Sequence, residues 1–283
     1  MVEWITSNKI PLGVWLKNFV AFLNQYAQGF FDTIALVLDT IIEALLQVML
    51  WFPPLALVAI FAAGAWFLHR SIGLTIFVVV GLLLVINLGY WVATVETLAL
   101  VVCATLVCVA IGVPVGIAAA HRPWLYTAIR PILDLMQTIP TFVYLIPTLV
   151  LFGLGMVPGL ISTVIFAIPA PIRLTHLGIS SVPKQLHEAG EAFGATRRQL
   201  LFKVELPYAL PTIMAGITQC IMLSLSMVVI AALVGADGLG KPVVRALNTV
   251  NVGMGFEAGL AIVILAILLD RVCKRPERRI RRS

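Results

Sequence analysis

The chain has 283 residues, of which 61% are hydrophobic and only 11% are charged, with a formal net charge of +6. A soluble domain carries about 25% charged residues, so this composition excludes an ordinary soluble protein and is typical of a polytopic membrane protein. The positive charge does not indicate nucleic-acid binding. Most of the basic residues lie in short breaks between apolar runs, and six of them lie in the tail after the last run.

Residues 1–49 precede the first long apolar run. Their apolar side chains recur at helical spacing, at Phe30, Ile34, Val37, Leu38, Ile41, Ile42, Leu45, Leu46 and Met49. Asp32, Asp39 and Glu43 lie on the opposite face, and three acids argue against a full membrane crossing. The pattern predicts an amphipathic helix along the outer interface or, equally, a helix packed against the spans.

Residues 50–272 form the predicted membrane domain, an all-α bundle of about seven spans. Stretches of about 17 to 25 apolar residues can cross a bilayer as helices. The predicted spans are 50–69, 72–90, 93–119, 132–154, 158–173, 209–235 and 256–272.

The loops between the spans predict the orientation. One side collects fifteen of the nineteen basic residues, and only Lys9, Lys17, Lys241 and Arg245 fall on the other. The positive side is expected to be cytoplasmic. The N-terminus is therefore expected outside, and the basic tail 273–283 inside.

A cytoplasmic loop at 174–208 is too polar for lipid. Pro183 can begin a helix that runs to a break at Gly194, and a second short helix with Thr196 as N-cap is expected to end at Pro207. Two short helices joined at a glycine form a compact knob suited to a groove on another protein. The alternative is an ordinary amphipathic loop helix in which the glycine and the proline only mark its ends.

The loop contains a set of residues at fixed offsets: Glu188, Ala189, Gly190, Gly194, Val204, Leu206 and Pro207. These residues resemble the coupling loop of ATP-binding-cassette (ABC) importer permeases. The family pattern is Glu-Ala-Ala, three residues, Gly, nine residues, then Ile-x-Leu-Pro. The chain departs from the pattern only in Gly190 for the second alanine and Val204 for isoleucine.

The resemblance implies that the loop sits in a cleft of a separate ATPase subunit. Glu188 would face basic or polar groups there, and the small residues 189 and 190 would permit close approach. Gly194 would allow the turn, and Leu206 and Pro207 would fix the return of the chain into the sixth span.

Two other motifs do not support chemistry of their own. The stretch "GADGLGKP" at 235–242 approaches a phosphate-binding loop, but Pro242 replaces the hydroxyl residue and no strand precedes it. It is interpreted as an external turn, so this chain is expected to have no nucleotide or metal site. His69, His121, His176 and His187 lie near cytoplasmic ends of spans and are interpreted as interfacial anchors.

Two glycine pairs, Gly112–Gly116 and Gly255–Gly259, have the spacing that lets membrane helices approach closely. They indicate helix packing, either within the chain or at a subunit interface.

Broken helices tend to line transport pathways, and prolines crowd residues 131–171. We therefore assign pathway roles as hypotheses to Thr141, Phe142 and Tyr144, and to one helical face with Gln219, Met222 and Ser226. A hydrogen bond between neighbouring helices, or packing for the aromatic pair, explains these residues equally well.

From about Thr97 to Arg271 the chain is similar to the permeases of glycine betaine, proline betaine and choline importers. The segments that carry this likeness are "MQTIPTFVYLIPTLVLFGLG", "PTIMAGITQCIMLSLSMVVIAALVGADGLG" and "GLAIVILAILLDR". The resemblance implies a type I ABC importer permease fold in a bacterial inner membrane, two permease copies, two ATPase subunits that bind ATP and Mg, and an external binding protein. The alternative is a stand-alone secondary transporter or channel, which would require buried acidic ion sites.

Overall fold

The computed structural model describes residues 11–273, and every regular element within this range is helical. The elements are α2 (Leu12–Trp51), α3 (Pro54–His69), α4 (Ile72–Asn87), α5 (Trp91–His121), α6 (Pro123–Thr138), α7 (Thr141–Phe152), α8 (Met156–Ala167), α9 (Pro169–Ser180), α10 (Lys184–Ala192), α11 (Arg197–Leu200), the π-helix η1 (Leu201–Glu205), α12 (Leu206–Ala232), α13 (Gly240–Asn248) and α14 (Val252–Cys273). Residues 1–10 and the predicted basic tail after Cys273 lie outside the described range.

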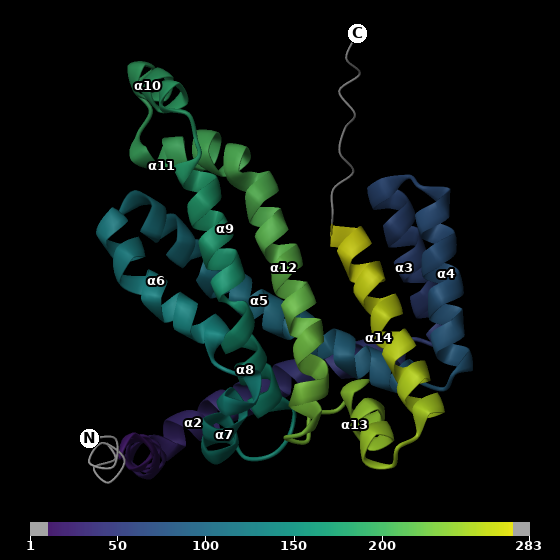
Figure 1. Cartoon of the computed structure of the whole chain (residues 1–283). Helices are drawn as coiled ribbons and strands as arrows, with labels where there is room; N and C mark the ends of the chain where they lie inside the picture. Colours follow the sequence, from purple (N-terminus) through teal and green to yellow (C-terminus); the bar gives the residue numbers. More distant parts are fainter. Residues whose placement is uncertain (1–10, 274–283) are drawn as a thin grey trace, which may run out of the picture.

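The centre of the molecule is the packing of α5, α9 and α12 (Figure 1). Small residues allow this close approach, since a Cβ atom at Gly116 would lie 2.6 Å from Cβ of Thr175. At Gly216 it would lie 2.9 Å from Cβ of Leu174. The Gly112–Gly116 pair therefore packs α5 against α9 within one chain. Gly255 lies near Ala246 of α13, whereas Gly259 faces open space.

The seven predicted spans do not all appear as single crossing helices. Within residues 11–273, five helical stretches are long and apolar enough to cross a membrane, or six if the bent pair α6–α7 counts as one span. The predicted spans 50–69 and 72–90 correspond to α3 and α4, which have 16 residues each. At 1.5 Å per residue each is about 24 Å long, shorter than a hydrocarbon core of about 30 Å.

Residues 132–154 do not form one continuous helix, because α6 and α7 meet at an angle of 97°. Pro140 causes the break: the residue before a proline is driven into an extended conformation, and Ile139 has ψ 131°. The Tyr144 hydroxyl then donates across the bend to the Met136 carbonyl at 2.6 Å.

The predicted span 158–173 is too short. Helices α8 and α9 follow one another through Ile168, which keeps helical dihedral angles, and together cover 25 residues from Met156 to Ser180. Pro169 does not end the helix, because it occupies the first turn of α9, where a missing N–H is tolerated. Residues 174–180, expected in the polar loop, are therefore helical.

Helix α2 combines features of both structures predicted for the N-terminal segment. It runs transversely to α9 and α12 at one end of the molecule (Figure 1), and it is also long and apolar enough to span. Leu38, Ile42, Leu45 and Leu46 pack against α5 and α8, whereas Phe30, Val37 and Ile41 are exposed. Part of the apolar set therefore packs on the bundle, and part remains available to lipid.

The basic residues lie at the two ends of the molecule to which the predicted topology assigns them. Arg70 lies in the α3–α4 turn, and Arg197 and Arg198 lie in α11, at the same end as α10 (Figure 1). Lys241 and Arg245 lie on α13 at the opposite end. Because cytoplasmic loops are enriched in Lys and Arg, the end with α10 is expected to face the cytoplasm.

Candidate functional site

The predicted coupling segment forms a helical hairpin that projects from one end of the molecule (Figure 1). We call residues 184–205 the knob: α10, the turn that follows, α11 and η1. Helix α10 starts directly after Pro183, as the sequence predicts. Within the knob, α10 packs against α11 and η1.

The turn between the two helices has the geometry of a Schellman motif. Gly194 has φ +73°, a conformation that favours glycine. Its N–H donates to the Glu191 carbonyl at 2.9 Å, and the Ala195 N–H donates to the Gly190 carbonyl at 3.0 Å. These bonds satisfy carbonyls that the helix end would leave without partners, so the predicted glycine turn is confirmed.

The second helix begins with the predicted cap at Thr196. The Gln199 N–H donates to the Thr196 hydroxyl at 3.3 Å, and the Thr196 N–H donates to the Gln199 side-chain oxygen at 2.8 Å. This reciprocal pair is a capping box.

The prediction that the second helix ends at Pro207 is wrong, since one helical stretch runs from Arg197 to Ala232. Immediately before the proline, the chain widens into η1, where the Leu206 N–H donates to the Leu201 carbonyl. The π-turn shifts the hydrogen-bond register by one residue, and the helix continues through Pro207.

The residues of the family pattern divide into two groups. The exposed residues of the knob form what we call the rim, and the apolar residues that pack on the helices beneath form what we call the anchor. Glu188 and Ala189 are exposed on α10, and Gly194 and Pro207 are exposed as well. Gly190 is partly buried against α11, because a Cβ atom there would lie 2.5 Å from Cδ2 of Leu200. The structure thus explains the small residue at 190 by packing inside the knob.

The anchor consists of Leu206, Leu201 and the partly buried Val204. Leu201 and Leu206 pack on a buried apolar cluster formed by Ile179, Ala209 and Ile213, to which α5 also contributes. The knob is therefore joined to α5, α9 and α12 through apolar contacts beneath it.

Sequence reasoning missed Phe193 at the tip of the knob. Its residue surface is 93% exposed, which is unusual for a large aromatic side chain. The available signal was its position directly before the turn glycine.

Sequence reasoning also missed a buried carboxylate below α10. Glu205 is only 4% exposed, and its two oxygens lie 2.8 Å from Nε2 of His121 and 2.8 Å from Nε2 of His187. These two histidines were interpreted as interfacial anchors, but both bind Glu205. His121 is 84 residues away in the chain, so no local pattern could indicate the contact.

The predicted pathway residues of α12 share one exposed face. Gln219, Met222 and Ser226 are exposed, whereas Thr218, Cys220 and Ser224 on the other side are buried. The Ser226 hydroxyl donates to the Met222 carbonyl at 3.0 Å. A polar face on a membrane helix is unfavourable in lipid, so this face requires a partner surface or water.

The predicted pathway residues of α7 lie at the bend. Thr141 is half-buried, and Phe142 is exposed. Tyr144 is partly buried, and its hydroxyl binds the Met136 carbonyl. The structure therefore gives Tyr144 a role in holding the bend.

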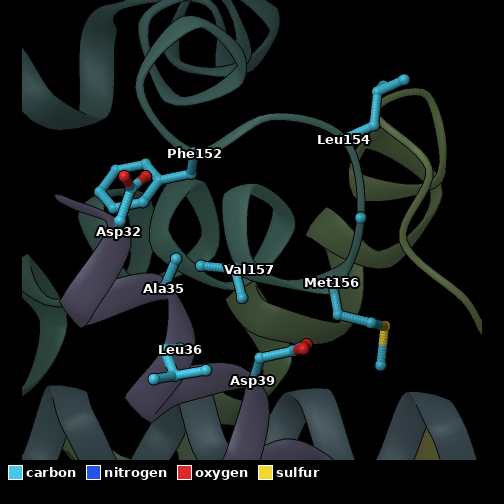
Figure 2. Close-up of a pocket in the computed structure, with 9 residues that line it drawn as sticks. Asp32, Ala35, Leu36, Asp39, Phe152, Leu154, Met156 and Val157 are labelled. Atoms are coloured by element: carbon cyan, nitrogen blue, oxygen red, sulfur yellow. The ribbon is translucent and has the colours of Figure 1, made fainter. Parts of the chain in front are cut away.

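A cavity of about 280 Å³ lies between α2 and the α7–α8 connection, at the end of the molecule away from the knob. Figure 2 shows Asp32 and Asp39 on α2 facing Phe152 and Met156 across it. The rings of Phe31 and Phe152 meet edge to face with centroids 5.4 Å apart. The acidic face of α2 is therefore directed at this connection.

The stretch 235–242 forms a turn followed by α13, as predicted, and lies at the end of the molecule opposite the knob (Figure 1). The Leu239 N–H donates to the buried Thr97 hydroxyl at 2.8 Å. A Cβ atom at Gly240 would lie 2.2 Å from the Val228 carbonyl oxygen. Close packing thus explains the glycine at position 240, and the hydrogen bond from Leu239 holds the turn against α5.

Comparison with known proteins decides the family. The model of the binding-protein-dependent transport system inner membrane component matches residues 112–282. The chain belongs to this family. It is a multi-pass permease of the inner membrane.

Individual relatives match over nearly the whole chain. The glycine betaine transport system permease protein OpuAB of Bacillus subtilis is 48% identical over 93% of both proteins. The glycine betaine/carnitine transport permease protein GbuB of Listeria monocytogenes is 47% identical over 93% of this chain and 94% of the relative. The glycine betaine/proline betaine transport system permease protein ProW of Escherichia coli is 44% identical over 93% of this chain and 74% of the relative.

A solved structure supports the fold. An inward-facing MetNI methionine ABC transporter matches with a TM-score of 0.56 and 28% identity, over 62% of this chain and 88% of that one. The all-α, type I ABC importer permease fold is thereby confirmed.

Proposed function

We propose that this chain is the membrane-spanning subunit of an ATP-driven importer for quaternary ammonium compounds such as glycine betaine, proline betaine or choline. The observation that carries the proposal is the exposed knob with Glu188 and Gly194 at the family offsets, at one end of a chain 48% identical to a glycine betaine permease. The names of the three relatives described above all include glycine betaine, which favours this substrate class.

The knob is the part that seats in a separate ATPase subunit. Its rim presents an exposed carboxylate at Glu188 and an exposed aromatic ring at Phe193. Aromatic side chains such as Phe193 are enriched as anchors at protein interfaces. ATP and Mg belong to that partner, and this chain contributes no ATPase site.

Two copies of the permease form the pathway. One chain carries one knob, whereas a pair of ATPases offers two clefts. A homodimer of the permease therefore provides one knob for each cleft. The exposed polar face of α12, with Gln219 and Ser226, then lies at a watery passage between the copies or against the second copy, where its polar groups find partners. Lipid covers the apolar outer surface, and an external binding protein delivers the solute at the end away from the knob.

Transport follows from coupling between these sites. Closure of the ATPase pair displaces the two knobs, and the apolar anchor under each knob passes the displacement to α5, α9 and α12. Coupling of this kind requires the ATPase to prefer one of the two permease conformations. The face of α12 then opens alternately to the two sides of the membrane.

The decisive experiment is uptake of labelled glycine betaine and choline by proteoliposomes that contain this chain, its ATPase and its binding protein. Uptake is expected only with internal ATP, and the preferred solute identifies the specificity. Uptake by this chain alone, without ATP, would contradict the proposal and assign a secondary transporter.

A charge reversal tests whether the knob binds in a cleft of the ATPase. Glu188→Arg is expected to leave insertion intact and to abolish uptake, because an exposed arginine cannot occupy a cleft that receives a carboxylate. Glu191→Arg makes the same charge reversal on α10 at a position outside the pattern and serves as the matched control. Normal uptake by the Glu188→Arg transporter would rule out the assignment of the coupling site.

A further inference from the structure

The buried contact between Glu205, His121 and His187 joins three separate segments of the chain. His121 is the last residue of α5, His187 lies in the middle of α10, and Glu205 ends η1 directly before α12. One carboxylate oxygen binds each imidazole at 2.8 Å.

The chemistry of this contact defines the donors. An ionised carboxylate can only accept hydrogen bonds, so each histidine donates from Nε2. Glu205 is almost fully buried, and a buried carboxylate is stable only when it is paired. Each histidine therefore contributes to holding Glu205 in place.

The position of the contact matters because α10 has few other attachments. It packs on α11 and η1, which lead directly into α12. By contrast, α5 packs along both α9 and α12 in the centre of the molecule. The pair His121–Glu205 gives the end of α5 a polar connection to η1, and His187 extends that connection to α10.

We propose that Glu205 is a positioning residue for transport, which ties the knob to the end of α5 so that α5 and α12 move together when α10 is displaced. This inference rests on the proposed function, in which an ATPase moves the knob. Through its two oxygens Glu205 holds α10 and α5 at a fixed separation. The apolar anchor joins Leu201 and Leu206 to α5 but contains no residue of α10, which His187 connects to Glu205.

The test measures solute transported per ATP hydrolysed in proteoliposomes with the full transporter and labelled glycine betaine. His187→Leu and His121→Leu each remove one donor, and Glu205→Leu removes the acceptor. His187→Gln and His121→Gln keep an amide donor near the position of Nε2. Gln185→Leu introduces the same apolar side chain at an exposed position of α10 and is the matched control.

We expect His187→Leu to copurify with the ATPase and to hydrolyse ATP at nearly the wild-type rate. Its solute-to-ATP ratio should fall roughly tenfold, the effect of losing one hydrogen bond to a charged group. His187→Gln should recover most of that ratio, and Gln185→Leu should keep it. Because all three residues act through one contact, adding His121→Leu or His187→Leu to Glu205→Leu should lower the ratio no further than Glu205→Leu alone.

The side chain of His121 is 45% exposed, so we expect the His121→Leu variant to fold. It therefore provides the test if the Glu205→Leu variant does not insert into the membrane. An unchanged ratio in His121→Leu and His187→Leu would overturn the inference. A loss that follows the yield of folded complex, without recovery in the Gln variants, would overturn it too and assign a merely structural role. Failure of the wild-type transporter to show ATP-dependent uptake would instead contradict the proposed function.

Discussion

The knob and the exposed face of α12 are both candidate functional surfaces, but they differ in how they are built. The turns of the knob are defined by hydrogen bonds within a few residues, such as those around Gly194 and the capping box at Thr196. The α12 face with Gln219, Met222 and Ser226 is exposed along a membrane helix whose opposite side is buried. One surface is complete in a single chain, whereas the other, under the proposed function, is half of a structure that two chains form.

This difference has an energetic cause. The knob projects from the bundle at the predicted cytoplasmic end, where water satisfies the charged groups of α10. A glutamine on the outer side of a membrane helix has no such solvent and is stabilised only by a polar neighbour or a watery passage, whereas the Ser226 hydroxyl already binds the Met222 carbonyl of its own helix. Changes in the knob should therefore act through its own turns, and changes on the α12 face through the assembled transporter.

After the charge reversal at Glu188, the largest effect is expected from Gly194→Ile in the turn of the knob. A β-branched residue at φ +73° is strained by about 1–3 kcal/mol, and the two helices of the knob would lose their alignment. Uptake should fall roughly tenfold or more, as measured in proteoliposomes. Gly194→Asn is the control, since asparagine tolerates this conformation better; equal activity of the two variants would show that the turn geometry is unimportant.

A smaller effect is expected from Gln219→Leu on the α12 face. If Gln219 binds the solute, water or the second copy in the assembled transporter, loss of that hydrogen bond of about 1 kcal/mol should lower uptake about fivefold at low solute concentration, while the amount of copurified ATPase stays unchanged. An unchanged uptake rate would indicate that Gln219 only packs between helices.

A matched pair of serines sharpens this prediction. Ser226 and Ser224 both donate to a carbonyl four residues earlier, at 3.0 and 2.9 Å, but only Ser226 is exposed. A charged thiol reagent should modify Ser226→Cys in the assembled transporter and leave Ser224→Cys unmodified. Protection of both positions would place the face against lipid or protein instead of water.

The sequence predicts the knob better than it predicts the spans around it. Pro183, Gly194 and Thr196 act on their immediate neighbours, so their effects follow from local rules. The bend of α6–α7 also follows from one proline, yet Pro140 and Pro169 have the same chemistry and opposite outcomes. Only the packed structure shows that Pro140 breaks a helix, whereas Pro169 starts one that continues the line of α8.

The rest of the site depends on contacts between distant segments. Glu205 occupies the variable position of the family pattern, and its partner His121 comes from another helix. Exposure gives Phe193 its significance, and exposure is a property of the folded chain. The local signal for Phe193 is its position directly before the turn glycine, whereas no periodicity or spacing in a single sequence indicates the contact between Glu205 and His121.

A still smaller effect is expected from Tyr144→Phe at the bend. This change removes the hydrogen bond to the Met136 carbonyl, which contributes about 1 kcal/mol. Thermal stability should fall slightly, while the preference between glycine betaine and choline should stay the same in competition uptake. An altered preference would favour the alternative role of Tyr144 in contacting the solute.

The smallest effect is expected from Gly190→Ala. A Cβ atom there would approach only the terminal Cδ2 atom of Leu200, which can rotate away, and alanine is the better helix former by about 0.5–1 kcal/mol. Uptake should therefore remain near the wild-type rate, as the alanine of the family pattern suggests. Gly190→Ile, which cannot be accommodated by rotation of Leu200 alone, should separate α10 from α11. If Gly190→Ala instead abolished uptake in a stable complex, the small residue would serve close approach to the ATPase, and the rim of the knob would extend to position 190.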